Sequence, residues 1–111
     1  MDRITEYRHI VKELLKRYAS QRPEEKNVET QLIFDPVNDH YQLLNVGWED
    51  EHRVYYCVLH LDLKGDKVWI QQNNTEHRVA EELIEMGIPK NRIVLGFQSP
   101  YKRQFTEFAV A

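Results

Sequence analysis

The chain has 111 residues, 41% of them hydrophobic and 11% aromatic, which is enough for one hydrophobic core and too apolar for a disordered segment. We therefore predict a single domain over residues 1–111. The net charge of −3 is unevenly spread: residues 1–22 carry +3, residues 23–87 carry −9 and residues 88–111 carry +3. An acidic middle of this kind excludes a uniform nucleic-acid footprint.

The sequence also limits where the protein works. No apolar run approaches the roughly 18 residues of a membrane helix. The charged start of the chain, residues 1–15, lacks the layout of a secretion signal. The single cysteine, Cys57, cannot form an internal disulfide. We expect a cytoplasmic protein without membrane contact.

Residues 2–20 are predicted to form an amphipathic helix. Asp2 is a candidate N-cap. Apolar residues recur at steps of three and four along one face: Ile4, Tyr7, Val11, Leu14, Leu15 and Tyr18. The basic residues lie largely elsewhere, where a solvated face is favoured over a phosphate-binding one. Pro23, in a polar stretch, ends the helix.

Four strands are predicted next, at 28–35, 41–48, 53–63 and 67–72. In the longest, alternation places Tyr55, Cys57, Leu59, Leu61 and Leu63 on one face, and Val54, Tyr56, Val58, His60 and Asp62 on the other. Both faces carry apolar residues. This indicates a central strand or a face that meets a second subunit, so a homodimer stays open.

Turn residues separate these strands. Lys64-Gly65-Asp66 has the composition of a hairpin loop, and Glu49-Asp50-Glu51 is a short charged break expected to lie in water. Gly47, inside a strand, predicts a bulge or a close backbone approach.

A second helix is expected after Asn74 or Thr75, either of which can cap it, with Gly87 at its C′ position. Residues 93–97 are predicted to form a short strand. The apolar tail, residues 99–111, is expected to dock on its own domain or on a partner. The predicted fold is α+β: an N-terminal helix, a four-stranded antiparallel meander, a second helix, a short C-terminal strand and a docked tail.

Only one pair of residues suggests chemistry. His60 and Asp62 share a strand face and offer a metal site or an acid–base pair. A histidine held by hydrogen bonds on a polar sheet face is the favoured interpretation. The histidines show no HExxH spacing, and Cys57 has no basic neighbour in sequence. We therefore predict no catalytic residue, no metal and no cofactor.

Large aromatic and basic residues indicate recognition instead, since aromatic rings and Arg anchor protein interfaces. The rings in the meander have core filling as their alternative, and the basic pair in the tail has a solvated turn. The predicted partner-binding residues are Tyr41, Trp48, Trp69, Tyr101, Lys102, Arg103 and Phe105.

Five blocks in fixed order resemble the XisI family, the fdxN element excision controlling factor proteins found mainly in cyanobacteria. They are QLIFD (31–35), HYQLLNVGW (40–48), HLDLKGDKVWIQQNNTE (60–76), AEELIEMGIPKNRIVLGF (80–97) and SPYKRQFTEFAVA (99–111). The resemblance runs from about Tyr7 to the last residue. Gln98 and His77-Arg78 depart from the family pattern, so no role is assigned to those positions.

The resemblance implies an α+β fold and a non-catalytic controlling role in programmed DNA rearrangement. The implied process is excision of the fdxN element by site-specific recombination during heterocyst differentiation. The implied partners are the nuclease-like companion protein XisH and a recombinase complex, with indirect contact to DNA.

Two alternatives stay open at this point. One is direct DNA binding through the basic N-terminal helix and the Lys102-Arg103 tail. The other is a metal-dependent enzyme that uses His60 and Asp62.

Overall fold

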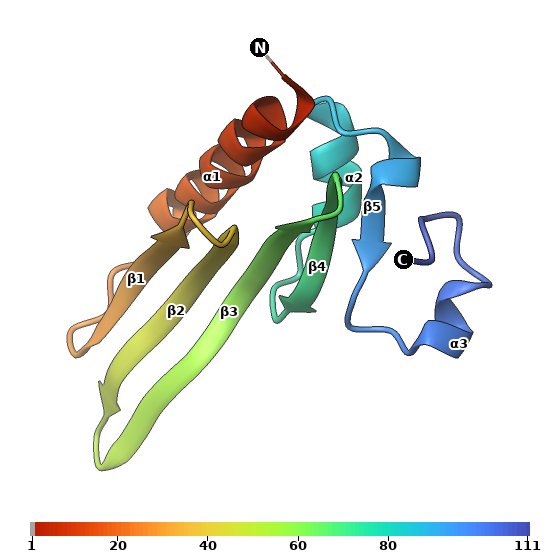
Figure 1. The fold of residues 1–111 in the computed structure, drawn as a ribbon. Helices are drawn as coiled ribbons and strands as arrows, with labels where there is room; N and C mark the ends of the chain where they lie inside the picture. The colour runs from red at the N-terminus through yellow and green to blue at the C-terminus, as the bar shows by residue number, and fades with distance from the viewer. Residues whose placement is uncertain (1) are drawn as a thin grey trace.

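The computed structural model describes residues 2–111, which form one sheet with its two longer helices on a single face (Figure 1). In chain order the elements are α1 (Arg3–Gln21), β1 (Val28–Asp35), β2 (His40–Glu49), β3 (His52–Lys64), β4 (Lys67–Asn73), α2 (Val79–Glu85), η1 (Lys90–Arg92), β5 (Ile93–Leu95) and α3 (Pro100–Arg103).

The strands lie side by side in the order β1-β2-β3-β4-β5. The first four pair antiparallel, and β5 pairs parallel to β4. A parallel pair requires a crossover connection, which α2 supplies between β4 and β5. The predicted α+β fold is confirmed, with its N-terminal helix, four-stranded meander, second helix and short C-terminal strand.

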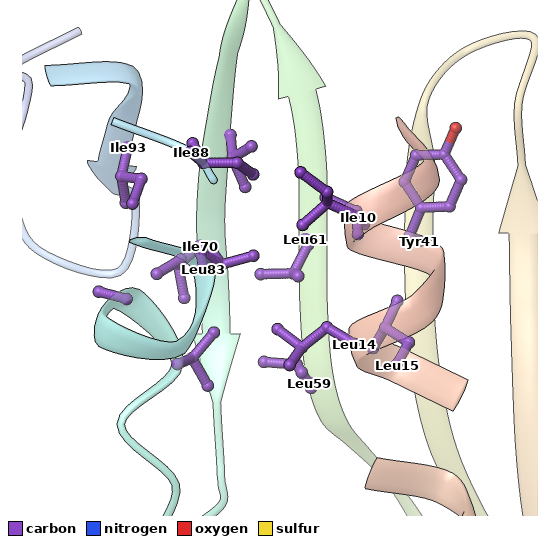
Figure 2. Packing of buried hydrophobic residues seen from close by; sticks show 14 of the residues in the cluster. Ile10, Leu14, Leu15, Tyr41, Leu59, Leu61, Ile70, Leu83, Ile88 and Ile93 are labelled. Atoms are coloured by element: carbon purple, nitrogen blue, oxygen red, sulfur yellow. The ribbon is translucent and has the colours of Figure 1, made fainter. Parts of the chain in front are cut away.

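The core lies between the sheet and the two helices α1 and α2 (Figure 2). Leu14 and Leu15 of α1 pack toward Leu59 and Leu61 of β3, and all four side chains are fully buried. Each such burial stabilises the fold by about 1.5–3 kcal/mol. Asp2 caps α1 as predicted, since its Oδ1 accepts from the Thr5 backbone N–H at 2.9 Å. Within residues 2–111, no helix has both the length and the apolar character needed to cross a bilayer.

The hairpin turns agree with the turn residues in the sequence. Gly65 and Asp66 join β3 to β4 with φ of 58° and 62°, the left-handed pair of a two-residue hairpin. Gly47 lies where the start of β1 approaches β2. A Cβ placed on Gly47 would lie 2.0 Å from the backbone oxygen of Asn27, so the predicted close backbone approach is confirmed.

One feature of β3 was predicted wrongly. Leu43 pairs with Leu59 and Leu44 with Cys57, so Val58 is an extra residue that bulges from the ladder. The bulge reverses the alternation on its N-terminal side. Tyr55 and Cys57 therefore share the face of His60 and Asp62, not the face of Leu59 as simple alternation predicted.

The start of α2 also differs from the prediction. The helix begins at Val79, and neither Asn74 nor Thr75 caps it. Thr75 belongs to a preceding turn, where its N–H donates to Asn73 Oδ1 at 2.9 Å. The C-terminal end is as predicted: Gly87 has φ of 117° and its N–H donates to the Ile84 oxygen at 3.0 Å.

The tail docks on its own domain. The Ala109 N–H donates to the Ile93 oxygen at 2.8 Å and forms a parallel bridge with Val94, so the chain end runs beside β5. Phe108 packs against the core. Figure 1 shows α3 and the C-terminus beyond β5, away from α1.

Candidate functional site

The sheet face opposite α1 and α2, here called the open face, carries three polar side chains close together. His40, the first residue of β2, pairs directly with Asp62 of β3. His60 lies two residues before Asp62 and therefore on the same face. His40 Nδ1 and His60 Nε2 each lie 2.8 Å from Asp62 Oδ1. These residues form the histidine–aspartate cluster.

Two glutamines hold the cluster in place. Gln71 Nε2 donates to Asp62 Oδ2 at 3.1 Å, the carboxylate oxygen that the histidines do not use. Gln42, opposite His60 in the ladder, brings its Nε2 within 3.5 Å of His60 Nδ1. Three further side chains thus surround Asp62 and His60, namely His40, Gln42 and Gln71, and both carboxylate oxygens of Asp62 have hydrogen-bond partners.

Burial and hydrogen bonding oppose each other at Asp62, whose side chain is 12% exposed. Burial favours the neutral acid, but the hydrogen bonds from His40, His60 and Gln71 outweigh it and lower the pKa of Asp62. The same hydrogen bond, with the Asp62 charge, raises the pKa of His40. Asp62 is therefore an anion at neutral pH, and it favours a positive charge on His40.

The cluster has the groups for metal binding or proton transfer. Its three donor atoms all lie within 4.8 Å of one another. The His40 side chain is 56% exposed and leaves the cluster accessible from solvent. The shared face of His60 and Asp62 was predicted from alternation. His40 was missed, because its position opposite Asp62 follows from the strand register, which the sequence pattern does not specify.

A strip of apolar side chains runs along the same open face, from the cluster toward the β2–β3 hairpin. The pairing of Val46 with Tyr55 and of Trp48 with Arg53 places these residues on that face. Tyr55 is 66% exposed and Trp48 50% exposed. The apolar strip consists of Ile33, Leu44, Val46, Trp48 and Tyr55. Tyr55 was not predicted as a binding residue. The bulge at Val58 changes the sheet face on which Tyr55 lies, and simple alternation does not predict a bulge.

The prediction for Tyr41 was wrong. It was predicted to bind a partner, but its side chain is fully buried on the helix-covered face (Figure 2). Its ring meets Phe34 edge-on, with ring centroids 5.6 Å apart, and its hydroxyl donates to Asp39 Oδ1 at 2.7 Å. Tyr41 alternates with the open-face residues His40 and Gln42, so it is core filling and not a contact surface.

Trp69 is partly covered by basic residues of its own chain. The Arg103 guanidinium carbon lies 5.0 Å from the Trp69 ring centroid, and Lys64 Nζ lies 4.6 Å from it. Arg103 Nε also donates to the Gln98 backbone oxygen at 3.0 Å. Arg103 therefore anchors the tail to the sheet, while its predicted companion Lys102 is exposed.

Tyr101 and Phe105 lie on the exposed side of the tail. Their rings meet edge-on with centroids 5.2 Å apart, and both residues are about 70% exposed (68% and 72%). They form a small aromatic pair, separate from the apolar strip of the open face.

The family model for the XisI protein matches residues 1–110. The chain belongs to the XisI family. The family resemblance of the sequence is thereby confirmed. No protein with a curated description matches the chain.

Two solved structures share the XisI fold with this chain along its length. An XisI-like protein from Anabaena variabilis ATCC 29413 is 49% identical, with a TM-score of 0.94. The fdxN element excision controlling factor XisI from the same strain is 37% identical, with a TM-score of 0.88. Each comparison covers 99% of this chain and 100% of the other.

The positions that depart from the XisI pattern have structural contacts here. His77 stacks on Tyr18 with ring centroids 4.2 Å apart, and its Nδ1 lies 3.6 Å from Glu82. Arg78 precedes α2 and pairs with Glu81 at 3.3 Å. His77 and Arg78 also line a pocket of about 240 Å³ between α2, β5 and the tail, apart from the open face.

Proposed function

We propose that this XisI-family chain is a non-catalytic controlling factor of programmed DNA rearrangement that acts by binding a XisH-type partner protein. The observation that carries the proposal is the 37% identity and full-length match to a structure named as the fdxN element excision controlling factor XisI. The process we assign is therefore control of site-specific excision, with the recombinase complex reached through the partner.

The open face suits a protein partner. In its apolar strip, Trp48 and Tyr55 are at least half exposed. The guanidinium carbon of Arg53 lies 5.3 Å from the Trp48 ring centroid. Aromatic and Arg side chains of this kind dominate binding energy at protein interfaces. The acidic residues around the strip include Glu29 and the hairpin residues Glu49, Asp50 and Glu51. A basic surface on the partner is the complement, since opposite potentials speed encounter and disfavour wrong partners.

The proposal assigns no catalysis to the chain. Burial raises the pKa of the Cys57 thiol, which keeps it protonated at neutral pH and makes it a poor nucleophile. Direct DNA binding is less well supported than protein binding, because key basic residues are already paired. Arg8 pairs with Asp39 at 2.9 Å, and Arg103 lies on Trp69.

Co-expression with a XisH-type protein tests the proposal. We expect the two chains to elute together in size exclusion at low salt, with a mass that exceeds either chain alone. The mass of the isolated chain, measured in parallel, reports whether it also forms a homodimer. Separate elution at low salt would contradict the proposal, and tight salt-sensitive binding of the isolated chain to duplex DNA would favour the DNA-binding alternative.

A further inference from the structure

We propose that the histidine–aspartate cluster binds one divalent transition-metal ion, with His40 Nδ1, His60 Nε2 and Asp62 Oδ1 as its protein ligands. The proposal replaces the sequence-based expectation of no metal. It is independent of the proposed function, because it concerns the isolated chain and requires neither a partner nor DNA.

The spacing of the donors carries the proposal. Each imidazole nitrogen lies 2.8 Å from Asp62 Oδ1, and all three donor atoms lie within 4.8 Å of one another. In a tetrahedral zinc site with bonds of about 2.0–2.1 Å, ligand atoms lie about 3.4 Å apart. An ion would lie between these three atoms. A neutral imidazole binds it by keeping its proton on the other ring nitrogen, and a small outward movement of the side chains makes room for the ion.

The residues around the cluster have the arrangement of an outer coordination shell. Gln71 holds Asp62 Oδ2 at 3.1 Å and leaves Oδ1 directed at the two rings. The Gln42 amide faces His60 Nδ1 at 3.5 Å. With its amide turned over, Gln42 accepts the Nδ1–H of His60, which leaves the Nε2 lone pair for the ion. Partners of this kind fix the tautomer and orientation of metal-bound histidines.

The donor set indicates the class of ion. Two imidazoles and one carboxylate suit first-row ions such as Zn²⁺ and Co²⁺, whereas Mg²⁺ and Ca²⁺ prefer oxygen ligands alone. Three protein ligands leave at least one coordination position of the ion open. Because the His40 side chain is 56% exposed, water can reach this position from the open face.

Calorimetry on untagged, chelator-treated protein tests the site, with Zn²⁺ as titrant and Co²⁺ absorption spectra as a second readout. We expect one ion per chain and no competition from Mg²⁺. His40→Ala and Asp62→Asn are expected to weaken Zn²⁺ binding by more than about tenfold, the lower range for loss of even an outer-shell partner. His52→Ala is the matched control, because His52 is exposed at the start of β3 outside the cluster, and we expect it to leave binding unchanged.

Two results would overturn the metal site. One is the lack of saturable Zn²⁺ and Co²⁺ binding by the wild-type chain. The other is Zn²⁺ binding by His40→Ala with wild-type affinity, which would place the ion elsewhere. Because the His40 side chain is mostly exposed, this variant is expected to fold, and it decides the question even if Asp62→Asn does not fold.

Discussion

Arg8 of α1 and Asp39 of the β1–β2 turn, 31 positions apart, are joined by a two-point ion pair. Arg8 Nε donates to Asp39 Oδ1 at 2.9 Å and Nη2 donates to Oδ2 at 3.2 Å. The pair fixes the first half of α1 to the end of the sheet that carries His40. Asp39 has φ of 59°, a left-handed conformation that Asp and Asn tolerate better than other side chains.

Replacement of Asp39 tests this connection. We expect Asp39→Asn, which keeps the left-handed backbone, to lower the free energy of unfolding by about 1–2 kcal/mol through loss of charge-assisted hydrogen bonds. Asp50→Asn is the matched control, because Asp50 is exposed at the β2–β3 hairpin with φ of 55°. Urea unfolding of both variants measures the difference. If Asp39→Asn were as stable as Asp50→Asn, the Arg8–Asp39 ion pair would contribute nothing to the free energy of unfolding.

The same residue predicts a pH dependence. The hydrogen bonds from Arg8 lower the pKa of Asp39 below its unfolded value. The pair's contribution is therefore fully present above the unfolded pKa of about 3.9 and is lost as the pH falls through the lower folded pKa. Between pH 5 and pH 2, roughly spanning that range, the stability of wild type should fall more steeply than that of Asp39→Asn. Parallel curves would contradict this.

Gly47 predicts a backbone clash. A Cβ there meets the Asn27 backbone oxygen at 2.0 Å, and backbone atoms cannot move aside as a flexible side chain does. We expect Gly47→Ala to cost about 2 kcal/mol or more in stability. Gly65→Asn is the control, because Gly65 has φ of 58° with open space around it, and Asn tolerates that conformation. A thermal melt in which both variants match wild type would refute the clash.

Tyr18 connects α1 to α2. Its buried hydroxyl donates to Glu82 Oε2 at 2.6 Å, and burial together with this hydrogen bond raises the pKa of Tyr18. We expect Tyr18→Phe to lower the free energy of unfolding by about 1.5–3 kcal/mol, the range for a hydrogen bond to a charged group. The exposed Tyr101→Phe serves as control and should leave stability unchanged. Denaturant midpoints that coincide for the two variants would remove Tyr18 as an interhelical connection.

Arg103 predicts how firmly the tail is held. Its cation–π contact with Trp69 and its hydrogen bonds to the Gln98 and Gly96 oxygens suggest a loss of about 1 kcal/mol in Arg103→Ala. Trp69 emission should shift to the red as the ring gains contact with water. Lys102→Ala, one residue away and exposed, is expected to change neither quantity. An unchanged emission spectrum in Arg103→Ala would show that the tail does not depend on this contact.

Local signals predicted much of the fold. The cap at Asp2, the hairpin at Gly65-Asp66 and the close approach at Gly47 each depend on a few neighbouring residues, and all are present. The predicted start of α2 was wrong, because Thr75 forms a turn with Asn73 and does not cap the helix. Ser, Thr and Asn residues favour caps and turns alike, so the sequence could not separate the two.

The candidate site depends on long-range register, which alternation alone does not provide. His40 joins Asp62 only because β2 and β3 pair at those residues. The bulge at Val58 moves Tyr55 to the open face, while Tyr41 falls on the buried face and leaves the set of contact residues. A single extra residue in one strand thus changes which side chains a partner can reach.

The affinity of a XisH-type partner for open-face variants tests the central claim most directly. We predict that the Trp48→Ala/Tyr55→Ala double variant binds the partner more than about tenfold more weakly than wild type. Interface hot spots are enriched in Trp and Tyr, and truncating one costs about 2 kcal/mol or more of binding free energy. Val37→Ala is the control, because Val37 is exposed in the β1–β2 turn outside the apolar strip, and it should bind with wild-type affinity. Full affinity in the double variant would contradict recognition through the open face.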